Sequence, residues 1–175
     1  LDKIQHDLIR EALRLTGIDS GIEITTIADI PGQGTGLGSS STVTVGLLNA
    51  MHAFQGRKVS NEQLAEEACQ IEIDTLGAPI GRQDQYAASF GGVNSIRFGE
   101  SGVKVEPIEV SKGLAKKFSE NFTLVFTGLT RSASKVLSEK SDDQSDKITR
   151  MREIRNHADE AASHVEKENL DSLGD

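Results

Sequence analysis

The sequence lacks what disulfide-bonded, membrane-spanning and nucleic-acid-binding proteins need. Its single cysteine, Cys69, excludes an internal disulfide framework and favours a reducing compartment. No apolar run reaches the roughly 20 residues of a membrane span, and no charged-then-apolar leader opens the chain. Acidic residues outnumber basic ones, 27 to 19, and no basic stripe offsets the net charge of −8. We therefore expect a cytoplasmic protein that binds neither nucleic acid nor membrane.

What the sequence does contain is a glycine-rich segment from Pro31 to Ser41. It follows a strand-like run at 21–30 and leads into a helix-like run at 39–55. Glycine lets backbone N–H groups turn inward, and the first turn of a helix adds unpaired N–H donors at a positive dipole end. The segment therefore predicts an anion cradle, and phosphate is the anion expected there.

Two common phosphate motifs do not fit this segment. A P-loop places Lys and then Ser or Thr after its last glycine, but no lysine occurs between Lys3 and Lys58. A dinucleotide fingerprint needs a glycine at its sixth position, where counting from Gly32 gives Leu37. A mobile glycine linker is disfavoured too, because linkers rarely join a periodic strand to so apolar a helix.

Two acidic residues further along the chain fit the needs of phosphoryl transfer, which are a metal ligand and a group that orients the attacking hydroxyl. Glu72 borders the apolar face of a helix expected at 61–76, which begins with a capping box at Ser60. Asp84 opens the next helical segment. Taken alone, each is better explained as a solvated charge or a helix cap.

The segment from Pro31 to Ser40 resembles the second signature motif of the GHMP small-molecule kinases, the family of galactokinase, homoserine kinase and mevalonate kinase. The resemblance implies that ATP phosphates are bound by Gly34, Thr35, Gly36, Leu37, Gly38, Ser39 and Ser40. It also implies that Ser40 and Glu72 bind Mg²⁺. Asp84 would be the catalytic residue, orienting the substrate hydroxyl or accepting its proton. This joint pattern favours a functional role over the two separate structural ones.

Within that family, the sequence most resembles the bacterial sugar kinases that phosphorylate D-glycero-D-manno-heptose 7-phosphate, through the segments 30–42, 80–88 and 126–134. This implies phosphoryl transfer from MgATP to a hydroxyl of a small-molecule heptose phosphate. The side chains expected to contact it are Arg82, Tyr86, Thr130 and Arg131. For either arginine, an ion pair with a neighbouring carboxylate explains its presence equally well. A kinase for another small alcohol, such as galactose, fucose or mevalonate, stays open, as does a noncatalytic phosphate-binding fragment.

The resemblance implies an α+β protein with the GHMP kinase fold. Residues 1–110 would belong to an N-terminal, ATP-binding domain like domain 2 of ribosomal protein S5, and 111–175 would begin a ferredoxin-like C-terminal domain. The first and third family motifs do not occur in the sequence, so we expect a truncated chain, which can lack activity by itself. The oligomeric state stays open, a homodimer included.

Hydrophobic periodicity and turn residues give the expected elements. Helices are expected near 2–16, 39–55, 61–76, 84–90, 112–119, 132–141 and 144–168. Strands are expected near 21–30, 92–98, 102–108 and 121–127. The helix at 39–55 should bury a stripe of Val43, Leu47, Ala50 and Phe54, broadened by Leu48 and Met51.

Overall fold

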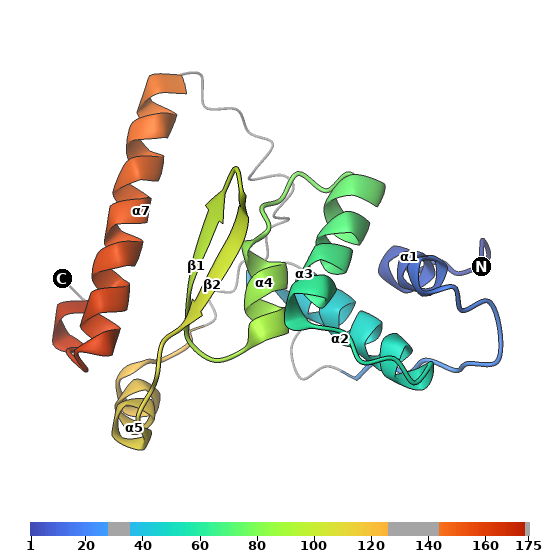
Figure 1. Cartoon of the computed structure of the whole chain (residues 1–175), viewed down its shortest axis with the longest axis horizontal. Helices are drawn as coiled ribbons and strands as arrows, with labels where there is room; N and C mark the ends of the chain where they lie inside the picture. Colours follow the sequence, from blue (N-terminus) through green and yellow to red (C-terminus); the bar gives the residue numbers. More distant parts are fainter. Residues whose placement is uncertain (28–35, 126–143, 174–175) are drawn as a thin grey trace. The chain divides into compact units, whose positions relative to one another are not determined.

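The computed structural model describes residues 1–27, 36–125 and 144–173, the last of these without the side chains of 144–147 (Figure 1). The chain divides into two compact units, with a boundary after Phe90. Each unit is described by itself below. The domain boundary expected near residue 110 stays a prediction.

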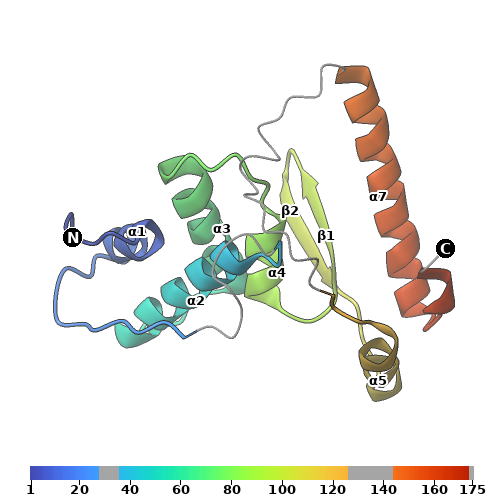
Figure 2. The ribbon, with the colours of Figure 1, turned by 180° about the vertical axis from the view of Figure 1, so that it is seen from behind.

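The first unit is helical. Its elements are α1 (Asp7–Thr16), α2 (Ser39–Phe54), α3 (Asn61–Cys69), the π-helix η1 (Gln70–Thr75) and α4 (Gln83–Phe90). Helix α2 contacts α1, α3 and α4, and Figure 2 shows it from behind. The buried apolar side chains that hold these helices together are Ala12, Leu13, Ile18, Val45, Leu47, Leu48, Met51, Leu64, Ala68 and Ile71. This core joins α1, α2, α3 and η1, and Ala88 of α4 packs against it.

The buried face of α2 differs from the stripe that the sequence predicted. Leu47, Leu48 and Met51 are buried as expected, but Phe54 is 60% exposed and Ala50 is also exposed. Helices pack against α2 on several sides, so the polar Thr44 is buried as well. A single apolar stripe describes a helix with one covered face, and α2 is covered over a wider arc.

The helix expected at 61–76 is two elements instead of one. Ser60 caps α3 as predicted, because its Oγ accepts a hydrogen bond of 3.1 Å from the N–H of Gln63. The chain then widens into the π-helix η1, where the N–H of Leu76 reaches the carbonyl of Ile71 at 3.0 Å. Single π turns are rare and often occur at functional sites. Glu72 lies in this turn.

The second unit contains the predicted hairpin. Strands β1 (Asn94–Gly99) and β2 (Gly102–Pro107) pair in antiparallel register, with Gly99 opposite Gly102. This confirms the strands expected at 92–98 and 102–108 within a residue or two. The remaining elements are α5 (Lys112–Asn121), α7 (Gln144–Glu166) and the short 3₁₀ helix η2 (Asp171–Leu173). A small core of Ile108, Leu114 and Val165 joins them.

Two other predicted strands are wrong where the structure describes them. Residues 22–27 and 122–125 form no strand, and Ile27 and Leu124 are 91% and 79% exposed. A strand needs a neighbour for its N–H and C=O groups, and within the described ranges only β1 and β2 pair. The helix expected at 132–141 lies outside the described residues. No helix in the described part of the chain combines the length and apolarity needed to cross a membrane.

Candidate active site

The first turn of α2 has no side-chain cap. Its N-cap residue is Gly38, in the left-handed conformation with φ of 66°, and glycine has no side chain to bind the first N–H groups. The carbonyl of Gly38 accepts hydrogen bonds of 3.0 Å from both the N–H and the hydroxyl of Thr42. A helix end of this kind, with its positive dipole, suits an anion.

Gly38 lies directly against Asp84, the first-turn carboxylate of α4. A Cβ atom placed on Gly38 would be 3.3 Å from Cγ and 3.4 Å from Oδ2 of Asp84. Both the positive φ and this close approach favour glycine at position 38. The fold therefore brings the end of the glycine-rich segment and the predicted catalytic carboxylate together, and Asp84 is exposed there.

The next residue of α4, Gln85, reaches Glu72. Its Nε2 donates a hydrogen bond of 2.7 Å to Oε2 of Glu72, and both side chains are buried, with 0% and 3% of their surface exposed. The N–H of Ala78 also donates to the backbone carbonyl of Glu72, at 3.0 Å. Thus one turn of α4 carries Asp84 beside Gly38 and Gln85 beside Glu72.

The surroundings of Glu72 fit a magnesium ligand. No Lys, Arg or His of the described chain forms an ion pair with its buried carboxylate, which therefore lacks a cationic partner. Among the described residues, no three or more His, Cys, Asp or Glu side chains form a group that could hold a metal ion by themselves. Mg²⁺ needs no such cluster, because it is usually held by one or two carboxylates together with nucleotide phosphates. Ser40, the other predicted ligand, lies exposed in the first turn of α2.

Arg82 and Tyr86, two predicted substrate contacts, have partners within the protein. The Tyr86 hydroxyl donates to one oxygen of Glu66, Arg82 donates to the other, and the guanidinium lies 5.7 Å from the centre of the tyrosine ring. Burial and the bond to Glu66 raise the pKa of Tyr86 to about 12. Residues i and i+2 of a helix do not share a face, so Tyr86 points away from Asp84.

Substrate contact by Arg82 or Tyr86 stays a prediction. The ion pair that the sequence offered as an alternative for Arg82 is present, although half of the Glu66 side chain remains exposed. Thr130 and Arg131, the other two predicted contacts, lie outside the described residues. So do Gly34 and Thr35 of the predicted ATP loop, whereas Gly36, Leu37 and Gly38 to Ser40 are described.

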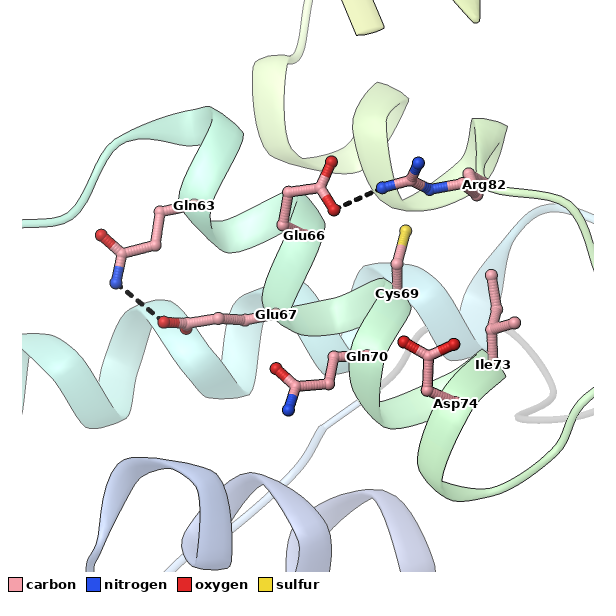
Figure 3. A pocket seen from close by; sticks show the side chains of 8 residues that line it. All are labelled: Gln63, Glu66, Glu67, Cys69, Gln70, Ile73, Asp74 and Arg82. Atoms are coloured by element: carbon pink, nitrogen blue, oxygen red, sulfur yellow. Dashed lines mark hydrogen bonds and ion pairs between the residues drawn. The ribbon is translucent and has the colours of Figure 1, made fainter. Parts of the chain in front are cut away.

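A cavity of about 470 Å³ opens beside this cluster (Figure 3). Its lining residues are Gln63, Glu66, Glu67, Cys69, Gln70, Ile73, Asp74 and Arg82. Three carboxylates against one guanidinium make it unsuited to a nucleotide triphosphate. Burial raises the pKa of the Cys69 thiol, which makes it a poor nucleophile. The cavity is lined by neither Gly38, Asp84 nor Glu72, and we place the candidate site at those residues instead.

Sequence reasoning missed the contact between Gln85 and Glu72 and the role of Glu66 as a shared acceptor. Helix α4 has only eight residues, too few for periodicity to show which polar side chain faces inward. Glu66 carries no motif at all, and its two partners come from 16 and 20 residues further along the chain.

Several known proteins are similar to this chain in sequence. Residues 4–92 match the family described as the GHMP kinases N terminal domain. The chain is 36% identical over 116 residues to D-glycero-alpha-D-manno-heptose 7-phosphate kinase of Campylobacter jejuni, covering 66% of this chain and 34% of that protein. It is 33% identical over 87 residues to mevalonate kinase of Methanothermobacter thermautotrophicus, covering 50% of this chain and 28% of that protein.

A solved structure is similar over most of the chain. The D-glycero-D-manno-heptose 1-phosphate kinase of Bacteroides thetaiotaomicron superposes with a TM-score of 0.78 at 27% sequence identity. The superposition covers 94% of this chain and 50% of that one. The chain thus spans half or less of the length of each of these relatives.

Proposed function

The chain belongs to the GHMP kinase family, as its sequence predicted, and on that premise we propose that it carries the nucleotide-binding and metal-binding part of an ATP-dependent small-molecule kinase. One observation supports this most directly. The uncapped first turn of α2 meets Asp84, and the residue after Asp84 holds the buried Glu72. Phosphoryl transfer needs this combination of anion cradle, metal carboxylate and hydroxyl-orienting group.

Each part of the site would have a distinct task. The glycine-rich segment and the first N–H groups of α2 bind the phosphates of ATP, helped by the helix dipole. Glu72 and Ser40 hold Mg²⁺, which when bound offsets the negative charge of the phosphates. Asp84, exposed beside Gly38, orients the attacking hydroxyl and accepts its proton.

The proposed acceptor is a hydroxyl of a heptose phosphate. Two similar proteins are named as heptose phosphate kinases, one of them over 94% of this chain. Another small alcohol remains the alternative, because a mevalonate kinase is also similar over half of the chain. Arg82, one of the two arginines predicted to contact the substrate, is paired with Glu66, so Arg131 is the first residue to test for binding of a substrate phosphate.

The test is magnesium-dependent ATP consumption by the full-length gene product with a panel of acceptors: heptose 7-phosphate, heptose 1-phosphate, galactose and mevalonate. Asp84→Ala should lower turnover at least about 100-fold, the lower end of what a positioned proton acceptor contributes. Asp74→Ala is the matched control, since Asp74 is an exposed aspartate outside the site. Equal turnover of the Asp84 variant and the wild type would remove Asp84 from the mechanism.

A further inference from the structure

Gln85 is a polar side chain without any exposed surface, although it follows the exposed Asp84. The nitrogen and the oxygen of its amide differ in their hydrogen bonding. Nε2 donates to Oε2 of Glu72 at 2.7 Å, while Oε1 is buried and has no hydrogen-bond partner among the described residues. A buried amide with one end unsatisfied is uncommon, because native proteins pair nearly all such atoms.

The carboxylate of Glu72, which accepts this hydrogen bond, is also buried and has few partners. Its carboxylate is 3% exposed and has no cationic partner in the described chain, so a single neutral donor, Gln85, compensates for the loss of water. The backbone of Glu72 is held separately, because its carbonyl accepts a hydrogen bond from the N–H of Ala78, just beyond the end of η1. The carboxylate is thus held by Gln85 through Oε2, and Oε1 has no hydrogen-bond partner among the described residues.

We propose that Gln85 is a positioning residue: it aims the Glu72 carboxylate at a bound divalent cation. This inference rests on the proposed function, which makes Glu72 the metal ligand. Nε2 holds Oε2, which leaves Oε1 of Glu72 to face the cation. The unpartnered Oε1 of Gln85 is an acceptor for a water ligand of that cation, and Mg²⁺ usually keeps several such waters.

A hydrogen-bond donor behind a metal-binding carboxylate restricts its orientation before the metal arrives. Losing such an outer-shell partner typically lowers metal affinity about 10-fold to 100-fold. Glutamine suits this task because it donates to the carboxylate without a positive charge that would compete with the cation. Its place next to Asp84 links the cation and the substrate hydroxyl through a single turn of α4.

The experiment measures Mn²⁺ binding by electron paramagnetic resonance, with a non-hydrolysable ATP analogue present, on the full-length gene product. Gln85→Leu should raise the Kd for Mn²⁺ by about 10-fold or more. Gln83→Leu, which changes an exposed glutamine two residues earlier in the same helix, should leave it unchanged. Gln85→Met keeps the length of the side chain and serves if the leucine variant does not fold. An unchanged Kd in a folded Gln85 variant would overturn the inference.

A double-mutant cycle distinguishes a positioning role from general destabilisation. In a Glu72→Gln background, Gln85→Leu should cause no further change in the Kd, because its effect acts through the carboxylate. An equal loss in both backgrounds would overturn the inference while leaving the proposed function intact. If Glu72→Gln alone does not weaken Mn²⁺ binding, the metal role in the proposed function fails, and the inference fails with it.

Discussion

Replacing Gly38 by alanine tests the contact that brings the phosphate segment to the carboxylate of α4. Two consequences follow from the structure. The residue has φ of 66°, a conformation that costs a side chain about 1–2 kcal/mol. The new methyl group would also lie 3.3 Å from Cγ of Asp84, closer than the 3.5–4.0 Å of optimal carbon contacts, so Asp84 must move by a few tenths of an ångström.

Gly36→Ala separates these two effects. Gly36 has nearly the same φ, 72°, but a Cβ atom there would meet nothing within 4 Å. Because Asp84 is exposed and can yield, the steric part should add well under the 1–3 kcal/mol of an overpacked core. Both alanine variants should therefore lose about 1–2 kcal/mol of unfolding free energy, a drop of about 2–4 °C per kcal/mol in Tm.

Turnover should distinguish the two positions where stability does not. A reacting group displaced by 1 Å can lower a rate about 100-fold, so a shift of a few tenths predicts about a tenfold loss for Gly38→Ala. This loss should disappear in an Asp84→Ala background, where Cγ and Oδ2 are gone. Any loss caused by Gly36→Ala should be the same in both backgrounds. Urea unfolding and steady-state kinetics of the four combinations measure both quantities.

A Gly38→Ala variant that lowers turnover by the same factor with and without Asp84 would refute the reasoning. The contact would then be incidental to phosphoryl transfer. A variant more stable than the wild type would refute the backbone conformation assigned to position 38.

Two further predictions concern buried groups. Tyr86 is the only tyrosine, so tyrosinate absorbance reports it alone. Because its pKa is raised from 10.0 to about 12, the folded state retains a proton that the unfolded chain loses. The contribution of this proton to the free energy of unfolding should be present in full below pH 10, and the free energy of unfolding should be about 1.4 kcal/mol lower by pH 11. The Tyr86→Phe variant should not show this loss. An absorbance midpoint near pH 10 in the folded protein would contradict the prediction. Glu72→Gln should stabilise the metal-free protein by about 1 kcal/mol or more, because a neutral amide costs less to bury and can still accept from Gln85. With saturating Mn²⁺, the wild type should become the more stable of the two proteins in urea unfolding. A Glu72→Gln variant that is less stable than the wild type without metal would contradict a site left open for a cation.

The sequence predicted those parts of the fold that depend on local chemistry. The hairpin at 94–107 has two short alternating strands and a glycine at the turn, and Ser60 carries a capping signal that needs no distant partner. The strand expected at 21–30 was wrong over its described part, because a strand forms only where a second strand is present to pair with it. No sequence window shows whether a neighbour is present.

The candidate site was predictable only in part, for a similar reason. The glycine-rich segment, Glu72 and Asp84 could be selected by type and by resemblance to a known motif. The approach of Gly38 to Asp84 joins two elements that are far apart in the chain, and the inward direction of Gln85 depends on how α4 packs against α3. Nothing in the sequence signals the π-helical turn that places Glu72, since this turn contains no glycine or proline that would interrupt a regular helix.

Helix α4 places three consecutive side chains on three different partners: Asp84 on Gly38, Gln85 on Glu72 and Tyr86 on Glu66. Neighbouring residues of an α-helix are separated by a fixed 100° rotation and 1.5 Å rise, so the helix geometry sets the relative positions of all three contacts. Inserting a residue inside this helix would rotate all later positions together and remove each of their side chains from its present partner. The length and register of this short helix therefore cannot change without affecting all three contacts.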